Sequence, residues 1–311
     1  MSLSDRERYV LRGGEEPLQI TPESAGWQRS GLRILELAPG TSGRVVCGVA
    51  EVVILSLGGS ATITIDDEVS LDLLGRPGVF AGPSDVIYAP RDSTLTVNSS
   101  EGGRFAICSA VCERRLAPVR LAAEQVPVEL RGAGVASRQV HNFAVPGVLE
   151  ADRIIACEVI TPGGNWSSWP PHKHDEERPG ETRLEEIYYY EIAEGPGGAA
   201  GLAYQRVYGP GIDVLAEVRS GDAVLIPHGW HGPSIAAPGH DLYYLNVMAG
   251  PGPQRAWLIS DDPEHAWVRR SWAQQPVDPR LPIAGAGDEC AADGGAGGAA
   301  LPGGAAGRAR R

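Results

Sequence analysis

Four residues in the second half of the chain have the types and spacing of a metal site. His172 and His174 flank Lys173, and alternate residues of a strand share one face, so their imidazoles point the same way roughly 7 Å apart. Glu186 opens a β-prone run that we expect to pair beside the histidine strand, and His231 follows an apolar segment at an expected turn. Three neutral nitrogens and one carboxylate suit a divalent ion such as Zn, Mn, Fe or Ni.

The distribution of histidine supports a site confined to the second half. All seven histidines follow residue 140: His141, His172, His174, His228, His231, His240 and His265. The first half offers no imidazole, so we expect it to contribute structure and no metal chemistry. His228 competes with His231 as a ligand, but it lies inside a Pro-x-Gly turn, where side chains more often face solvent. His231 is therefore preferred.

The choice of carboxylate ligand rests on strand geometry. Eleven residues separate His174 from Glu186, and this interval holds five rival acids: Asp175, Glu176, Glu177, Glu181 and Glu185. We prefer Glu186 because it directly precedes the apolar part of the strand and shares a face with Tyr188 and Tyr190.

Composition bounds the class of protein. The chain has 311 residues, of which 42% are hydrophobic, and its 41 glycines and 25 prolines indicate short strands joined by tight turns. A net charge of -12 argues against a nucleic-acid partner. No apolar run suits a membrane span or a signal peptide, so we expect a cytoplasmic protein with no membrane partner. Five cysteines without a CxxC pair favour reduced thiols.

The chain shows two successive sets of expected β-strands. The first set covers residues 32–37, 52–57, 61–65, 69–73, 85–90 and 104–108. The second set covers residues 154–159, 172–174, 186–192, 203–208, 221–227 and 242–247. Segments 82–90 and 220–227 are alike, which indicates a degenerate internal duplication. We therefore predict an all-β fold of two antiparallel β-sandwich barrels, joined by an Ala-, Arg- and Glu-rich connection near residues 113–140.

Two patterns resemble the metal motifs of cupins, and a longer match is more specific. The motifs are Gly164…His172-x-His174…Glu186 and Gly221…Pro227-x-Gly229…His231, with a longer interval before the glutamate than cupins generally have. The longer match covers Gly164 to Asp175, Leu184 to Tyr189, Tyr204 to Tyr208 and Tyr243 to Pro251. It resembles the 5-deoxy-glucuronate isomerases of bacterial myo-inositol catabolism, strongly over residues 140–272 and weakly over the first half.

This resemblance implies a bicupin, meaning two jelly-roll barrels with the first one degenerate. Residues 1–125 would form the degenerate cupin-like sandwich and residues 126–284 the metal-binding cupin domain. Residues 285–311 are mostly Gly and Ala, with too little bulky apolar surface to form a core, so we expect a disordered tail. The sequence leaves open whether the chain forms a homo-oligomer.

The resemblance also implies an activity. It is the aldose–ketose isomerisation of 5-deoxy-glucuronate to 2-deoxy-5-keto-gluconate, an intramolecular oxidoreductase reaction on a small sugar acid. The related family acts on 5-keto-4-deoxyuronate. Two other functions remain open at this stage: an Fe-dependent cupin dioxygenase and a non-catalytic sugar-binding cupin.

Roles for individual residues follow from this activity. Arg206 is predicted to bind the substrate carboxylate, because a planar guanidinium pairs with it bidentately, although its strand face is as compatible with solvent as with a cavity. Tyr190 and Tyr244 are predicted to contact the sugar. The catalytic base is unknown, with Glu176 and Tyr188 as candidates.

Overall fold

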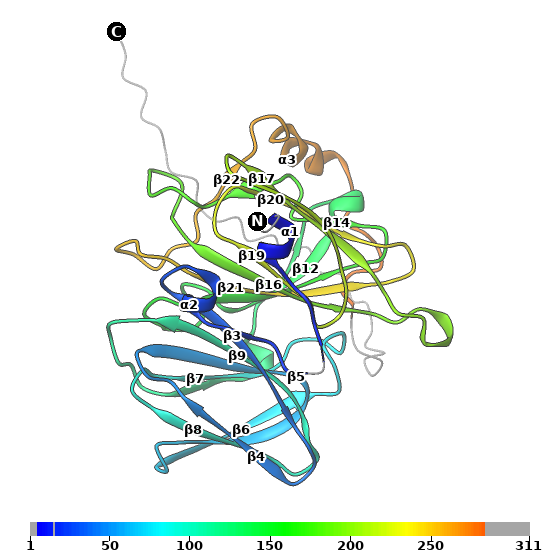
Figure 1. Ribbon diagram of the computed structural model, residues 1–311. Helices are drawn as coiled ribbons and strands as arrows, with labels where there is room; N and C mark the ends of the chain where they lie inside the picture. Colours follow the sequence, from blue (N-terminus) through cyan, green and yellow to red (C-terminus); the bar gives the residue numbers. More distant parts are fainter. Residues whose placement is uncertain (1–4, 15, 284–311) are drawn as a thin grey trace.

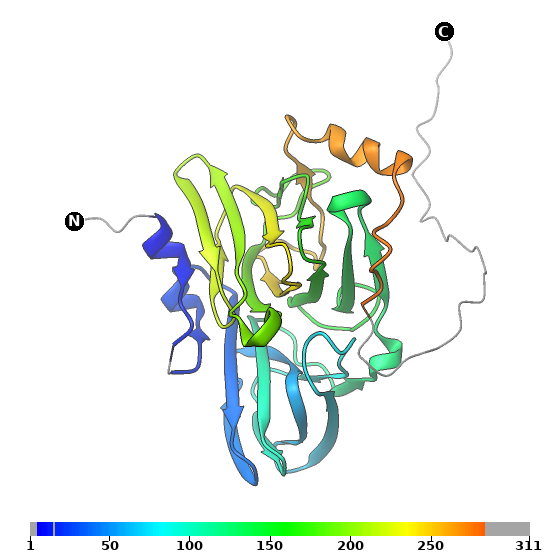
Figure 2. The same cartoon turned by 90° about the vertical axis from the view of Figure 1, so that its right-hand side faces the viewer.

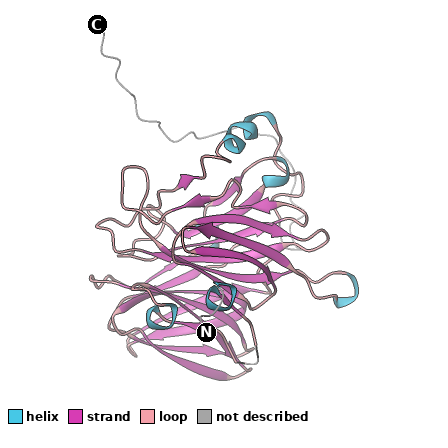
Figure 3. Cartoon of the chain, turned by 45° about the horizontal axis from the view of Figure 1, so that its top comes forward, coloured by secondary structure: helices cyan, strands magenta, loops and turns pink. Residues whose placement is uncertain are grey.

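Strands dominate the computed structural model, which describes residues 5–14 and 16–283. Figure 3 shows the strands in magenta with a few short helices at their margins. Apart from its N-terminal segment, which lies beside β19, the first half of the chain (blue to cyan) occupies the opposite end of the molecule from the second half (green to orange) (Figure 1). The predicted tail, residues 285–311, lies outside the described residues.

The first half forms one nine-stranded antiparallel sheet that curves around its own apolar core. Strand β5 is central and pairs with four others. The strands are β2 (Gln19–Ile20), β3 (Ser30–Leu37), β4 (Thr41–Val46), β5 (Ala50–Ile65), β6 (Val69–Arg76), β7 (Val86–Ala89), β8 (Thr94–Ser99), β9 (Gly103–Val111) and β10 (Val119–Leu121).

The second half contributes two sheets, and their order decides where the site forms. The seven-stranded sheet has the order β1-β19-β16-β21-β13-β12-β11, and the six-stranded sheet has β18-β17-β20-β15-β22 with β14 beside β20. The first comprises β1 (Val10–Leu11), β11 (Val128–Arg131), β12 (Arg138–Ala144), β13 (Ile155–Thr161), β16 (Glu185–Ile192), β19 (Ala223–Ile226) and β21 (Leu242–Ala249). The second comprises β14 (Trp166–Ser167), β15 (His172–Lys173), β17 (Ala203–Gly209), β18 (Ile212–Val218), β20 (Trp230–Ala236) and β22 (Ser260–Asp261).

Helices are short and lie at the edges of the sheets. The α-helices are α1 (Asp5–Tyr9), α2 (Pro22–Ala25) and α3 (Trp267–Ser271). The 3-10 helices are η1 (Ala123–Gln125), η2 (Gly134–Ala136), η3 (Pro196–Gly198) and η4 (Trp272–Gln274). In Figure 2 the segment that carries α3 and η4 (orange) lies at the end of the molecule farthest from the first half. Within the described residues, no helix has the length and apolar character that a membrane span requires.

The seven-stranded sheet is buried on both faces because it is the middle layer of the molecule. Along β16, Tyr189 points to the first half and hydrogen-bonds Arg104 of β9, whereas Tyr188 and Tyr190 point to the six-stranded sheet. One core cluster of buried apolar residues runs through both halves. The nearly continuous apolar sequences of β16 and β21 reflect burial on both faces of the sheet.

The predicted all-β, antiparallel character is confirmed, and most predicted strands occur near their expected positions. Segments 52–57 and 61–65 form the single strand β5, which accommodates a register shift between Ser56 and Gly58 and a left-handed φ of 98° at Gly59. The strands that were not expected are β1, β2, β4, β8, β10, β11, β12, β14, β18, β20 and β22. The bicupin arrangement and the boundary at residue 125 stay predictions, and strand β1 pairs across that boundary with β19.

One expectation about pairing is wrong. The glutamate strand β16 does not pair beside the histidine strand β15. It pairs with β19 and β21, whereas β15 pairs with β20 and β22 in the facing sheet. The sequence contains no local signal for such long-range pairing, and the consequence is a site between two sheets instead of along one.

Candidate metal centre

Three of the predicted ligands converge between the two sheets. His174, Glu186 and His231 are fully buried, and one donor atom from each lies within 4.8 Å of the others. The Nε2 atoms of His174 and His231 lie 3.0 Å and 3.1 Å from Oε2 of Glu186. Three ligand atoms therefore surround a single point in the apolar interior.

Each of these residues is placed by a different strand. Glu186 stands on β16 of the seven-stranded sheet, His231 on β20 of the six-stranded sheet, and His174 directly after β15. His231 was expected at a turn, but the strand begins one residue earlier, at Trp230, and His231 lies within it. Asp175 holds that turn, because its Oδ2 accepts a hydrogen bond from the Gly229 amide at 2.8 Å.

The hydrogen bonds on the far side of each ring fix the tautomer. Nδ1 of His174 lies 3.3 Å from the Leu184 carbonyl, and Nδ1 of His231 lies 3.3 Å from the Gly229 carbonyl. A carbonyl only accepts, so Nδ1 carries the proton in a neutral ring and Nε2 presents a lone pair. With Nδ1 protonated, both Nε2 atoms face the same carboxylate oxygen, so either a proton or a metal ion lies between each nitrogen and that oxygen. A divalent ion bound by all three atoms would satisfy these acceptors together.

The pKa shifts of Glu186 and His174 also favour a positive charge at this site. Burial acts to raise the pKa of Glu186, but the hydrogen bonds from His174 and His231 outweigh it and lower that pKa to about 2. Burial acts to lower the pKa of His174, and the contact with Glu186 reverses this and raises it. The carboxylate and the imidazoles are therefore coupled through charge.

A further partner orients the carboxylate. Nδ2 of Asn246, on β21, donates to Oε1 of Glu186 at 2.7 Å, which leaves Oε2 free to face the two imidazoles. Ligands whose other atoms are held in this way are typical of metal sites. The residues present therefore fit a divalent ion of the class that accepts imidazole and carboxylate. The sequence reasoning did not identify Asn246.

His172, the fourth predicted ligand, lies beside this group but is not part of it. Its ring centroid is 4.4 Å from that of His231, with which it pairs across the strands, and 6.4 Å from that of His174. Burial, followed by the charges of His231 and His174, lowers the pKa of His172 well below its ordinary value. Its role as a ligand stays a prediction.

The predicted tyrosines line the space between the sheets. Tyr188 stacks on Tyr244 with ring centroids 4.9 Å apart, and its ring lies edge-on to His231 at 6.1 Å. The Tyr244 hydroxyl hydrogen-bonds Ser167 at 2.9 Å, and the Tyr190 hydroxyl donates to Gln205 at 3.0 Å. Their predicted contacts with a sugar are not tested by this geometry.

Arg206 and Glu176 lie elsewhere. Arg206 is on the outward face of β17, over the Tyr208 ring and paired with Asp213, while its neighbour Gln205 points inward. Glu176 is half exposed and pairs with Lys173. Neither belongs to the group around Glu186, so the substrate role of Arg206 and the catalytic role of Glu176 stay predictions.

Lys173 lies between the two histidines, faces away from the ligand group and is buried. Its ammonium pairs with Asp175 and, at 2.9 Å, with the fully buried Glu181. Asp175 and Glu181 are thus committed to this ion cluster behind the histidine strand and not to the ligand group.

Comparison with known proteins identifies the family. The family model described as KduI/IolB matches residues 7–268. The chain belongs to the KduI/IolB family. Over 258 residues it is 39% identical to a 5-deoxy-glucuronate isomerase of Geobacillus kaustophilus, covering 82% of this chain and 91% of that protein. It is 34% identical to the protein of the same name from Bacillus subtilis strain 168, covering 80% and 91%.

Solved structures agree with the family assignment. An IolB-like protein from Salmonella typhimurium LT2 superimposes with a TM-score of 0.77 at 31% identity, covering 84% of this chain and 99% of that one. Oxalate decarboxylase of Bacillus subtilis, whose Mn(II) centres have been characterised, superimposes with a TM-score of 0.57 at 14% identity. At that identity the second likeness concerns the fold alone, which is of the cupin type.

Proposed function

We propose that this protein is a metal-dependent 5-deoxy-glucuronate isomerase that forms 2-deoxy-5-keto-gluconate. One observation carries the proposal: two imidazole nitrogens and a carboxylate oxygen converge within 4.8 Å of one another in the buried interior, the donor set that a divalent ion takes. Membership of a family whose curated relatives carry this name supports the choice of substrate.

The ligand set proposed is His174, Glu186 and His231, with His172 as the fourth member. An ion held there would supply a Lewis acid that polarises a carbonyl without redox change. The fixed positions of the ligands would reduce reorganisation as negative charge develops on the substrate.

The chain's own groups must then move a proton between adjacent carbons of the sugar. Of the two candidates for this role, Tyr188 lies at the ligand group, edge-on to His231, and its hydroxyl is 3.3 Å from that of Ser168. Glu176 lies behind the histidine strand with Lys173. We propose Tyr188 as the proton-carrying residue on position alone, and the buried Tyr190 and Tyr244 as the wall that keeps water out.

The test is anaerobic turnover of 5-deoxy-glucuronate by purified protein of measured metal content. We expect product to form without oxygen, and turnover to vanish with the metal in Glu186→Ala. Glu191→Gln is the matched control, because Glu191 stands on the same strand but faces Arg104. Rapid turnover by fully metal-free protein, or activity that depends on oxygen, contradicts the proposal.

A further inference from the structure

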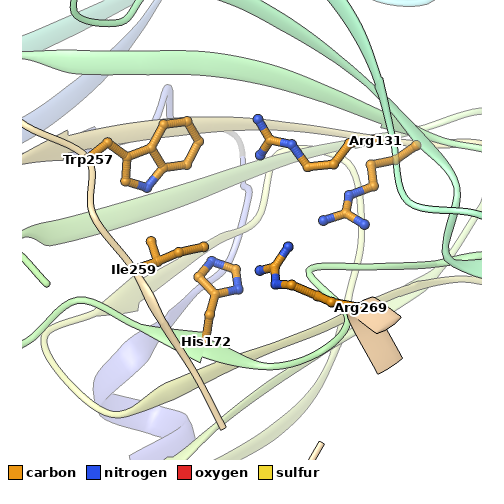
Figure 4. Close-up of a pocket in the computed structure, with 6 residues that line it drawn as sticks. Arg131, His172, Trp257, Ile259 and Arg269 are labelled. Atoms are coloured by element: carbon orange, nitrogen blue, oxygen red, sulfur yellow. The ribbon is translucent and has the colours of Figure 1, made fainter. Parts of the chain in front are cut away.

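A hollow lined by three arginines opens beside the candidate metal centre. Its volume is about 180 Å³, which admits several heavy atoms because one water needs roughly 15 Å³. The residues that line it are Arg131, Arg138, His172, Trp257, Ile259 and Arg269. Figure 4 shows the Arg269 guanidinium beside the His172 imidazole, with Trp257 and Ile259 along the side of the hollow. The hollow therefore reaches His172, which pairs across the strands with His231 of the ligand group.

Two of the three guanidinium charges are already balanced. Arg131 donates two hydrogen bonds to Glu129, at 2.9 Å and 2.7 Å. Arg269 donates two to Asp261, one of them at 2.6 Å. Three cations and two carboxylates leave one positive charge, and it belongs to Arg138.

Arg138 is buried without a counter-charge. Its side chain makes one hydrogen bond, from Nη1 to the Ala136 carbonyl at 3.0 Å, and its guanidinium lies 5.3 Å from the Trp272 ring centroid. No carboxylate pairs with it anywhere in residues 5–14 and 16–283. A guanidinium has five N–H donors, so most of its hydrogen-bonding capacity remains for a ligand. Burial lowers the pKa of Arg138 to about 10, which still leaves it charged at neutral pH.

A second buried arginine shows what the fold does when an unpaired guanidinium is structural. Arg255 also lacks a carboxylate partner, but it donates to the carbonyls of Ile154, Leu149 and Ala144 at 2.6, 2.8 and 2.7 Å. Backbone carbonyls accept from all three nitrogens of Arg255. The backbone leaves Arg138 open toward the hollow.

We propose that Arg138 is the anchor for the carboxylate of the sugar acid, inside the hollow that His172 joins to the metal centre. The proposal rests on the proposed function and refines it. In 5-deoxy-glucuronate the reacting carbons and the carboxylate are at opposite ends of a six-carbon chain. The hollow offers a feature for each end, with a single uncompensated positive charge on Arg138 for the carboxylate and, through His172, access to the ligand group. Arg206, which pairs with Asp213 and lines a separate hollow with Tyr208, is the rival anchor.

The kinetic test compares metal-loaded Arg138→Gln and Arg138→Lys with the wild type. For Arg138→Gln we expect KM for 5-deoxy-glucuronate to rise roughly 10- to 100-fold, the range for losing a hydrogen bond to a charged group, with kcat little changed. Arg138→Lys restores the charge without the planar fork, so its KM should lie between the two. Arg255→Gln is the control: it should lower the melting temperature and leave KM unchanged.

A binding measurement separates this inference from the proposed function. Calorimetry with D-glucuronate and D-glucose tests carboxylate recognition without turnover, and we expect the wild type to prefer D-glucuronate and Arg138→Gln to lose that preference. Failure of wild-type turnover sinks the proposed function, yet the binding preference still decides the role of Arg138. An unchanged KM and preference in folded, metal-loaded Arg138→Gln overturns the inference, as does a rise in KM confined to Arg206→Lys. If Arg138→Gln does not fold, equal inhibition of the wild type by D-glucose and D-glucuronate overturns it.

Discussion

Two buried glutamates, on strands that flank β21 in the same sheet, have opposite partners. Glu186 on β16 points toward the six-stranded sheet. It accepts a hydrogen bond from Asn246 of the neighbouring strand β21 and contacts the imidazoles of His174 and His231. Glu158 on β13 faces the first half, where it pairs with Arg76 of β6 and accepts a hydrogen bond from Tyr243 at 2.7 Å. In both, burial acts to raise the pKa and the partners lower it to about 2.

The two glutamates differ in which groups balance their negative charge. The Glu158 carboxylate has a full cationic partner in Arg76 and a third contact from His141 at 3.1 Å, so the group is complete within the chain. Within the described part of the chain, no guanidinium or ammonium pairs with Glu186, which contacts two imidazoles instead. A perturbed carboxyl alone therefore does not mark a site, whereas one that faces imidazole nitrogens without such a partner does.

The largest effect should come from removing the charge of Glu186. Glu186→Gln keeps the shape of the side chain but takes away the charge that binds a cation, so metal content should fall to background. Turnover should fall by more than about 100-fold, since losing an outer partner of a metal ligand alone costs roughly 10- to 100-fold. Elemental analysis and anaerobic assays measure both, and full metal occupancy in this variant would erase the contrast with Glu158.

The complementary change is Glu158→Gln. It leaves the buried Arg76 without its counter-charge, and the free energy of unfolding should drop by about 3–5 kcal/mol, while metal content is retained. Urea denaturation measures the loss. Glu36→Gln removes an exposed partner of Arg104 and serves as the control, with a loss below about 1 kcal/mol. If Glu158→Gln loses no more free energy of unfolding than this control, the contact between the two halves does not depend on the Glu158–Arg76 pair.

The contribution of the Glu158–Arg76 pair to the free energy of unfolding should fall at low pH. The pKa of Glu158 is about 2 in the folded protein, against an ordinary value of 4.5, so the unfolded chain binds more protons between these values. Its contribution is fully present above about pH 4.5 and is lost as pH falls toward 2. In metal-free protein we expect the wild type to lose stability over this window more steeply than Glu158→Gln. Parallel pH profiles of the two proteins would contradict the assignment.

The smallest effect should come from the residue that orients Glu186. Asn246→Ala removes the hydrogen bond to Oε1 and should weaken metal affinity roughly 10- to 100-fold while leaving the fold intact. Competition with a chelator measures the affinity. Asn98→Ala, at an exposed position of the first half, is the matched control and should bind metal as the wild type does.

The strands could be predicted from alternation and turn residues, whereas their partners could not. The strand that carries Glu186 could be predicted from its β-prone residues. Its place in the sheet that faces the histidine strand depends on pairing with β21, some sixty residues away. Period-two alternation could not decide which face of β17 is inward, and Arg206 lies on the outward one.

The arginines of the hollow were missed for a related reason. Arg131 and Arg138 lie in a stretch taken as a connection between barrels, although it forms strands β11 and β12. The signal was present in the apolar alternation of Val128–Arg131 and Arg138–Ala144. Their convergence with Arg269 of α3 is a property of the folded chain, and no local pattern encodes it.

The pairing of β1 with β19 has a consequence for how the protein is made. Val10 pairs with Val224, and the anchor beside it, the Gly13 amide donating to Asp222 at 2.9 Å, spans a similar stretch of sequence. At a synthesis rate of roughly 5–20 residues per second, the first strand leaves the ribosome at least about ten seconds before its partner. The N-terminal segment therefore stays unpaired during translation of the first half, and the edge of the seven-stranded sheet forms only when most of the chain has emerged.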